Sequence, residues 1–246
     1  MVNLDVKHVT RKRKSIFPVM LLGLFFLMHT DVQAQRGDYG KRYSNEKQFR
    51  LGFTLSPLGS FFKAQEPGVE RNAGRFGVNF GVMFDYFLDA DNHYAISSGL
   101  SAVSAGSTLK YDAGKGLKDF STFPAEYDIR MQYLEIPVSL KLKTDLENDF
   151  SLYGQFGTFF QAPIRARTDI ITNGLKTEKV NIMGDVNPLN MGLLVGAGVE
   201  YPISESLTLT AGLSYQNGFI DVTRNSKWHD GRINNNSFAL RLGLFF

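Results

Sequence analysis

The sequence predicts an all-β fold, specifically an eight-stranded antiparallel transmembrane β-barrel. Three observations indicate it: apolar residues alternate with polar ones in eight segments, the connections alternate between short and long, and small polar residues occupy the second face of the segments. Residues 133–143, YLEIPVSLKLK, illustrate the alternation. Because a period of two places successive side chains on opposite faces, this segment predicts a strand with one apolar and one polar face.

The first four expected strands follow a polar N-terminal region. Residues 49–55 place Phe and Leu at every second position, and residues 76–86 alternate Phe, Val and Tyr with Gly, Asn and Asp. Residues 94–100 repeat the pattern more briefly, and residues 133–143 complete the set. Pro137 cannot donate a hydrogen bond to a neighbouring strand and usually lies at a sheet edge or a bulge, so in an edgeless barrel we expect a bulge there.

The other four expected strands occupy the C-terminal half. Residues 150–161 carry Phe and Leu on one face and Ser, Tyr and Gln on the other. Residues 189–201 alternate Leu, Met and Val with mostly small residues, and residues 207–215 and 238–246 repeat apolar residues, mainly Leu, at every second position. Each segment therefore has one apolar face, as the first four do.

The connections between the expected strands alternate in length. Short ones cover residues 88–93, 144–149 and 202–206, and long ones cover residues 57–74, 106–127, 163–188 and 218–235. This alternation is typical of outer-membrane barrels, in which short turns face the periplasm and long loops face the exterior. Asn173 and Gly174 form a turn signal within the third long connection and predict a protruding hairpin. A ten-stranded barrel that includes this hairpin is the alternative.

A soluble β-sandwich is the alternative fold, because its core face would also be an apolar stripe. The opposite face of a sandwich meets water and carries many Lys and Glu residues, whereas here Gly, Ser, Thr and Asn dominate and suit a narrow, filled lumen. Aromatic residues also gather at both ends of the strands, as expected at two bilayer interfaces. They are Tyr86, Tyr94, Phe150, Tyr201 and Phe246 on the short-turn side and Phe53, Phe76, Phe160 and Phe238 on the long-loop side.

The N-terminus has the pattern of a secretory signal peptide. A basic segment ends at Lys14, an apolar segment covers residues 16–28, and Val32-Gln33-Ala34 provides a small-residue cleavage site. The apolar segment is shorter than the ~20 residues of a spanning helix and contains Pro18, although an uncleaved anchor is the alternative. The expected organisation is a signal peptide at residues 1–34, a flexible periplasmic leader at 35–46 and an outer-membrane barrel at 47–246.

The composition excludes several functional classes. The chain lacks cysteine, which excludes disulfides, thiolate metal sites and cysteine nucleophiles. The formal net charge is +3, and residues 1–34 alone hold five basic and two acidic residues, so the remaining chain is close to neutral. A neutral chain has no basic footprint for a polyanion, and we expect no nucleic-acid partner.

Six charged residues lie on the inward faces of the expected strands. They are Arg50, Asp85, Glu135, Lys141, Glu200 and Arg241. Facing lipid, each would cost up to ~2–4 kcal/mol at mid-bilayer, so we expect them inside the barrel. Three basic residues match three acidic ones, and we expect a polar network that fills the lumen and fixes strand register, with Arg50 paired to Asp85 and Arg241 reaching Glu200 or Glu135. Independent hydrated charges near the strand ends are the alternative.

Three features resemble the PorT-like outer-membrane β-barrel family: the segment Tyr133-Leu134-Glu135-Ile136-Pro137, the strand from Ile96 that ends in Ser-Gly-Leu100, and the aromatic final strand. The resemblance covers about residues 47–246. It implies a Gram-negative outer-membrane location, contact with outer-membrane lipid, a C-terminal strand read by the barrel-assembly machinery, and no known catalytic residues. One member of that family belongs to the type IX secretion apparatus.

We therefore expect a non-enzymatic outer-membrane barrel that acts as a scaffold or assembly partner. We expect a protein partner to bind at its long loops. The alternative is a lipid-A-modifying enzyme that uses His229 with Ser226 and Asp230, although their spacing does not demand a catalytic triad. Residues 89–92 begin like a calcium loop but lack its glycine, and Leu100 stands in place of its glutamate. We expect no catalytic, cofactor-binding or metal-binding residues.

Overall fold

The computed structural model describes residues 48–146 and 150–246. These residues belong to one unit, Asn45–Phe246. The expected signal peptide at residues 1–34 and most of the region before the first strand, including the expected leader at residues 35–46, lie outside the described residues. Among the described residues, neither the length nor the hydropathy of any helix suits a transmembrane span.

The described residues contain nine strands and two short helices. The strands are β1 (Phe49–Ala64), β2 (Val69–Phe87), β3 (Tyr94–Tyr111), β4 (Ala125–Asp145), β5 (Ser151–Thr172), β6 (Leu175–Asn181), β7 (Asn190–Ser204), β8 (Leu207–Asp221) and β9 (Ile233–Phe245). The helices are the 3-10 turn η1 (Lys118–Phe120), between β3 and β4, and α2 (Asn225–Trp228), between β8 and β9.

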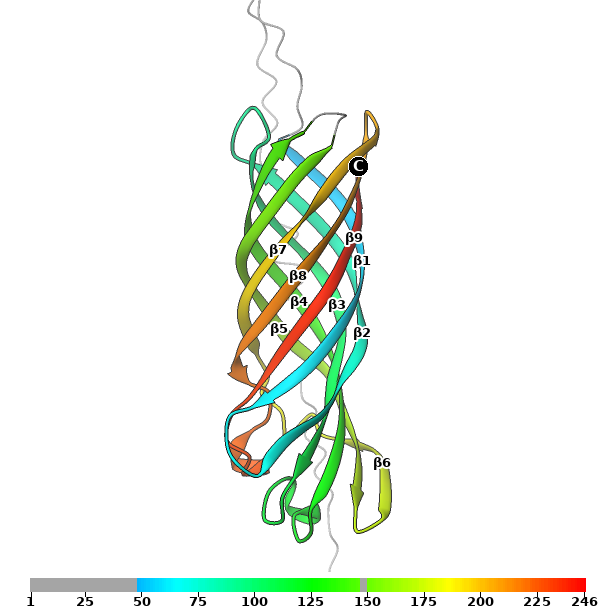
Figure 1. Cartoon of the computed structure of the whole chain (residues 1–246), viewed down its shortest axis with the longest axis vertical. Coiled ribbons are helices and arrows are strands. Elements are labelled where there is room, and N and C mark those ends of the chain that lie inside the picture. The colour runs from blue at the N-terminus through cyan, green and yellow to red at the C-terminus, as the bar shows by residue number, and fades with distance from the viewer. Residues whose placement is uncertain (1–47, 147–149) are drawn as a thin grey trace, which may run out of the picture. The chain divides into compact units, whose positions relative to one another are not determined.

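Eight of these strands form a closed antiparallel ring (Figure 1). The strands pair in the order β1-β2-β3-β4-β5-β7-β8-β9, and β9 pairs with β1 to close the ring. Of the described strands, only β5 pairs with β6, which therefore lies outside the ring. The prediction of an eight-stranded antiparallel barrel is confirmed, and the ten-stranded alternative is wrong.

The apolar stripe of the strands faces outward. On β4, Ile136, Leu140 and Leu142 are 46%, 45% and 47% exposed, whereas Glu135 and Lys141 on the alternate face are buried. A soluble sandwich would bury the apolar residues and expose the charged ones. An apolar outer surface around a polar interior is instead the arrangement of a barrel that spans a lipid bilayer.

The outward aromatic residues follow the expected two-ended distribution with one correction. The rings of Phe150 and Tyr201 lie 4.7 Å apart at the short-turn end. Phe53, which was expected on the long-loop side, has its ring 5.6 Å from that of Phe246. The strand register pairs Phe53 with Leu244, close to the end of β9, so Phe53 belongs to the short-turn side.

The strands extend far beyond the alternating runs, which corrects the expectation of long loops. β1 ends at Ala64 and β2 begins at Val69, so residues 65–68 alone connect them in place of the expected loop at 57–74. Outward positions in this extension, such as Glu70 and its partner Lys110, are polar and exposed. Beyond the lipid the apolar residues change face: inward positions such as Tyr127, Ile129 and Met131 are apolar and buried, outward positions are polar, and the backbone ladder continues.

The hairpin predicted in the third long connection is present as β5 and β6. Asn173 and Gly174 form its turn with φ values of 47° and 76°. Positive φ at both central residues is the geometry of the turn that Asn-Gly favours, because it matches the twist of the flanking strands. The hairpin projects beyond the ring at the end opposite the short turns, as Figure 1 shows.

The bulge expected at Pro137 is absent. The β3–β4 register pairs Ser98 with Val138 and Ser101 with Glu135, so it passes Pro137 without a shift. The pairing of β3 with β4 is interrupted only next to the proline, where the Ser98 hydroxyl donates to the Pro137 carbonyl at 2.7 Å. A side-chain donor thus takes part in the local hydrogen bonding, and the strand accommodates the proline side chain without an extra residue.

A hydrophobic cluster, here called the outer core, fills the space inside the extended strands and their connections. Its largest fully buried members are Phe62, Leu109, Tyr111, Tyr127, Ile129, Met131, Tyr133, Ile170, Ile182, Trp228 and Ile233. The Trp228 ring lies 5.1 Å from Tyr127 and 5.7 Å from Tyr111, and its indole N–H donates to the Asp185 carbonyl at 3.0 Å. The outer core closes the long-hairpin end of the barrel.

Candidate functional site

Four of the six expected lumen charges form one cluster near the short-turn end. Arg50 Nη2 lies 2.7 Å from Asp85 Oδ2 and 2.7 Å from Glu200 Oε1, so one guanidinium bridges two carboxylates. Lys141 Nζ lies 3.0 Å from the same Asp85 oxygen and also contacts Glu200 Oε1. These residues come from β1, β2, β4 and β7, so the cluster, here called the ion cluster, joins opposite walls of the barrel.

The ion cluster recruits further inward side chains that were not expected. Lys143 Nζ lies 3.3 Å from Glu200 Oε2, and the Ser97 hydroxyl donates to Asp85 at 2.5 Å. The Arg50 guanidinium also covers the Phe245 ring at 3.9 Å. Lys143 continues the inward series of β4 two residues after Lys141, and that spacing was the signal available in the sequence.

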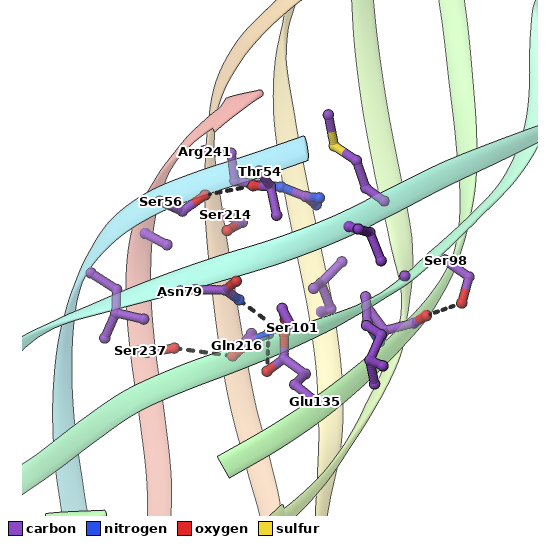
Figure 2. Close-up of a pocket in the computed structure, with 18 residues that line it drawn as sticks. Thr54, Ser56, Asn79, Ser98, Ser101, Glu135, Ser214, Gln216, Ser237 and Arg241 are labelled. Atoms are coloured by element: carbon purple, nitrogen blue, oxygen red, sulfur yellow. Dashed lines mark hydrogen bonds between the residues drawn. The ribbon is translucent and has the colours of Figure 1, made fainter. Parts of the chain in front are cut away.

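Glu135 lies outside this cluster and is held by amides instead of cations (Figure 2). Its carboxylate accepts hydrogen bonds from Gln216 at 3.1 Å and Asn79 at 3.2 Å, which Figure 2 shows. It also accepts one from Gln161 at 2.6 Å. The Asn190 amide in turn donates to Gln161 at 2.8 Å, which extends the chain of bonds. These amides stand on the polar faces of four different strands, so no local spacing reveals that they converge.

Arg241 lies in the wall of the same small cavity as Glu135, but it makes no ion pair within the described residues. Glu200, one of its two expected partners, is occupied by Arg50, Lys141 and Lys143. The structure therefore brings four of the six expected charges into contact and leaves Glu135 and Arg241 outside that group.

The free volume between these side chains is small, and a larger hollow of about 320 Å³ lies beside Arg50, Lys143 and Glu200 at the short-turn end. Two small cavities of about 40 and 20 Å³ lie along the interior, and both include Thr54, Met83, Ser98 and Arg241 in their walls. A single water needs roughly 10–15 Å³ of such volume, so the cavities hold a few waters at most. Side chains, and not solvent, therefore fill the lumen, as is usual for eight strands.

The residues considered for an alternative catalytic site do not assemble. His229 and Ser226 are exposed, whereas Asp230 is fully buried. The Asp230 carboxylate accepts hydrogen bonds from Tyr111 at 2.9 Å and Thr223 at 3.2 Å. Across residues 48–146 and 150–246, no side-chain hydrogen bond joins His229 to Ser226 or Asp230. Asp230 instead anchors the α2 connection to the outer core.

Asp230 makes the stability of the outer core depend on pH. Burial, together with the nearby Asp221 carboxylate, raises the pKa of Asp230 to about 6. Because the folded state holds the proton more tightly than the unfolded state, stability is greatest below the ordinary pKa of ~3.9 and falls as the pH rises to about 6. The difference between these two pKa values corresponds to a loss of stability on the order of 3 kcal/mol.

The expected result is a lower guanidinium unfolding midpoint at pH 7.5 than at pH 4.5, measured for the folded protein in detergent micelles. Asp230→Asn keeps an acceptor for Tyr111 and removes the charge, so its midpoint is expected to change less between the two pH values. Equal pH dependence in the variant and the native chain would contradict the assignment to Asp230.

One turn at the short-turn end brings possible metal ligands together. The ligand atoms of Asp89, Asp91 and His93 all lie within 4.8 Å of one another. The Asp89 carboxylate already accepts backbone N–H groups of His93 at 3.0 Å and Tyr94 at 2.8 Å, which accounts for its position as a turn stabiliser. That no metal binds here stays a prediction.

A family model and several solved structures are similar to this chain. The family model described as outer membrane protein beta-barrel domain matches residues 33–224. Among solved structures, Neisserial surface protein A is similar with 14% identity over 80% of this chain and 96% of that one, at a TM-score of 0.45. OprG from Pseudomonas aeruginosa has 14% identity over 80% and 94% of the two chains, at a TM-score of 0.38.

Ail, the attachment invasion locus protein of Yersinia pestis, is also similar, with 14% identity over 80% of this chain and 97% of that one, at a TM-score of 0.33. A search of curated protein sequences finds no significant match.

Proposed function

This chain belongs to the family of outer membrane protein β-barrel domains, and on that basis we propose that it acts as a non-enzymatic scaffold or assembly partner for other envelope proteins. The chain is a protein of the outer membrane, with its long hairpins on the outer side. A barrel can act through its lumen, through chemistry at its rim or through its surface. The structure of the lumen favours a function carried out by the outer surface.

The filled interior carries this proposal. Near the short-turn end the lumen is crossed by the ion cluster, and at the other end it is closed by the outer core. Such an interior supports recognition of a partner by the outer surface better than it supports the passage of a solute. The buried and fully bonded Asp230 likewise favours a structural role over proton transfer at this rim.

The projecting hairpin supplies a surface that suits a protein partner. Leu175 at the start of β6 is 72% exposed, and Ile171 on β5 and Phe123 before β4 are also exposed. Exposed apolar groups above the lipid boundary often mark interaction sites. We place the partner at these connections, and we place contact with the barrel-assembly machinery at the C-terminal strand, β9.

A more specific role rests on the resemblance of Tyr133–Pro137 to the PorT-like family. In this form of the proposal, the partner belongs to a protein secretion apparatus similar to the type IX system. The proposal thus has a general form, a scaffold that binds an envelope protein, and a specific form that names the kind of assembly. A cross-linking experiment that identifies the partner distinguishes the two.

A photo-reactive amino acid at Leu175 is expected to yield a discrete protein adduct in intact cells. The same amino acid at Leu209, an exposed apolar residue of β8 that faces lipid, is the control and should yield none. Folding of both variants is checked by heat-shifted gel mobility. Absence of adducts at Leu175 and at Phe123 would contradict the partner site.

Conductance of the purified protein in a planar bilayer tests whether the lumen is closed. Because side chains fill the lumen, no stable porin-like conductance is expected. Large and stable single-channel currents would mean that the lumen opens, and they would replace the scaffold role with transport.

A further inference from the structure

A basic hollow lies on the outer surface of the barrel wall formed by β2 to β6. It has a volume of about 280 Å³, and its walls include Arg75, Phe76, Arg130, Arg165, Arg167 and Lys179. We call it the arginine hollow. None of these residues belongs to the ion cluster of the lumen, and Arg165 and Arg167 are exposed.

A change of register in β5 creates the hollow. Gln132 of β4 pairs with Arg165, whereas the next residue, Tyr133, pairs with Pro163, so Ile164 is an extra residue in β5. Such a bulge reverses the faces on which the following side chains lie. Up to Ala162 the even-numbered residues face outward, and beyond the bulge the odd-numbered ones do, including Arg165 and Arg167.

The hollow begins where the lipid-facing surface ends. The last apolar row across this wall contains Ala102, Leu134 and Ala162, which pair with one another in the register. The next outward pair is Gln132 with Arg165, two residues further along the strands, or about 7 Å. Phe76 beside the hollow is 96% exposed, so an apolar group stands next to the cations at this boundary.

The charges of the hollow are not balanced within the protein. Asp128 and Asp169 compensate part of the positive charge: Arg130 lies 2.9 Å from the first and 2.7 Å from the second, and Arg75 lies 2.5 Å from Asp128. Within the residues that the structure describes, the side chains of Arg165, Arg167 and Lys179 have no ion-pair partner. Two guanidinium groups and one ammonium group therefore remain available to an anion.

We propose that the arginine hollow binds a phosphate group of a glycolipid in the outer leaflet of the outer membrane. Guanidinium groups bind phosphate oxygens in bidentate geometry, and the ammonium group of Lys179 adds a point charge. The hollow lies at the height where headgroups begin, and Phe76 and Ile164 are exposed beside it to contact the upper part of the acyl chains. This inference rests on the outer-membrane location and not on the scaffold role.

A lipid phosphate fits the hollow better than a free anion does. A soluble ion would gain nothing from the position of the hollow at the lipid boundary, whereas a membrane lipid arrives with its phosphate already at that height.

The double variant Arg165→Gln/Arg167→Gln tests the proposal. Native mass spectrometry of the folded protein, taken from detergent with added phosphorylated lipid A, measures how much lipid stays bound. Loss of two charge-assisted contacts is expected to weaken retention about tenfold or more. The control Lys63→Gln/Lys110→Gln removes two exposed cations outside the hollow and should retain lipid like the native chain.

Two further ligands separate the sources of phosphate. Dephosphorylated lipid A should bind the native chain as weakly as phosphorylated lipid A binds the double variant. Inorganic phosphate should not displace the lipid. Equal retention in the native chain and the double variant, an equal loss in the control variant, or full displacement by inorganic phosphate would each overturn the proposal. Heat-shifted mobility confirms that each variant is folded before the comparison.

Discussion

Replacing Glu200 with alanine is expected to destabilise the barrel by about 3–5 kcal/mol, because it removes one partner of a buried ion group. Glu200 is 1% exposed and contacts Arg50, Lys141 and Lys143. Without it, Asp85 is the remaining carboxylate that contacts the first two cations, and Lys143 has no ion-pair partner among the described residues. The midpoint of urea unfolding, followed by gel mobility of the protein refolded in lipid vesicles, measures the effect.

Two variants control this experiment. Glu200→Gln keeps the shape and an acceptor oxygen, so it should lose less stability than the alanine variant. Arg241→Ala removes a lumen cation that has no ion pair within the described residues, and it should have the smaller effect. If the Glu200 variants unfold at the same urea concentration as the native chain, the ion cluster does not hold the opposite walls together.

Replacing Trp228 with alanine is expected to open the outer end of the barrel while the ring stays folded. Trp228 is fully buried between Tyr111 and Tyr127, and removal of a buried aromatic side chain typically costs about 3–5 kcal/mol. The adjacent Lys227 is exposed, so loosening of α2 should make it a much faster site of trypsin cleavage. Rates of limited proteolysis on the folded protein in micelles measure this change.

Phe123→Ala is the matched control, because Phe123 is an aromatic residue at the same end but is 53% exposed. Its proteolysis rate should stay close to that of the native chain, and both variants should keep heat-shifted mobility. An unchanged cleavage rate in the Trp228 variant would show that the outer core does not depend on this side chain.

The local pattern of residues was enough to assign which residues of each spanning strand face lipid and which face the lumen. The alternation of side chains along a strand is a local property, so Leu140 and Lys141 could be assigned to opposite faces without knowledge of their neighbours. It also determined the Asn173-Gly174 hairpin, because the turn geometry depends on those two residues. The contact of Arg50 with Asp85 needed only the pairing of two consecutive strands.

Contacts across the lumen could not be obtained in this way. Glu200 lies 150 positions from Arg50 in the chain, and their meeting depends on the tilt and stagger of all eight strands. The same global geometry placed Glu135 among amides and left Arg241 without the expected partner. A matched count of charges therefore predicted a polar interior but not which residues meet within it.

The ends of the strands and the face on which the arginines lie depend on the folded barrel as a whole. Beyond the bilayer the outward face meets water and the inward face packs in the outer core, so the apolar residues change from the outward to the inward positions although the ladder continues. In β5 the extra residue Ile164 reverses the alternation, and it turns Arg165 and Arg167 outward. A bulge depends on pairing with the neighbouring strand, and for this reason the local pattern of one segment does not contain it.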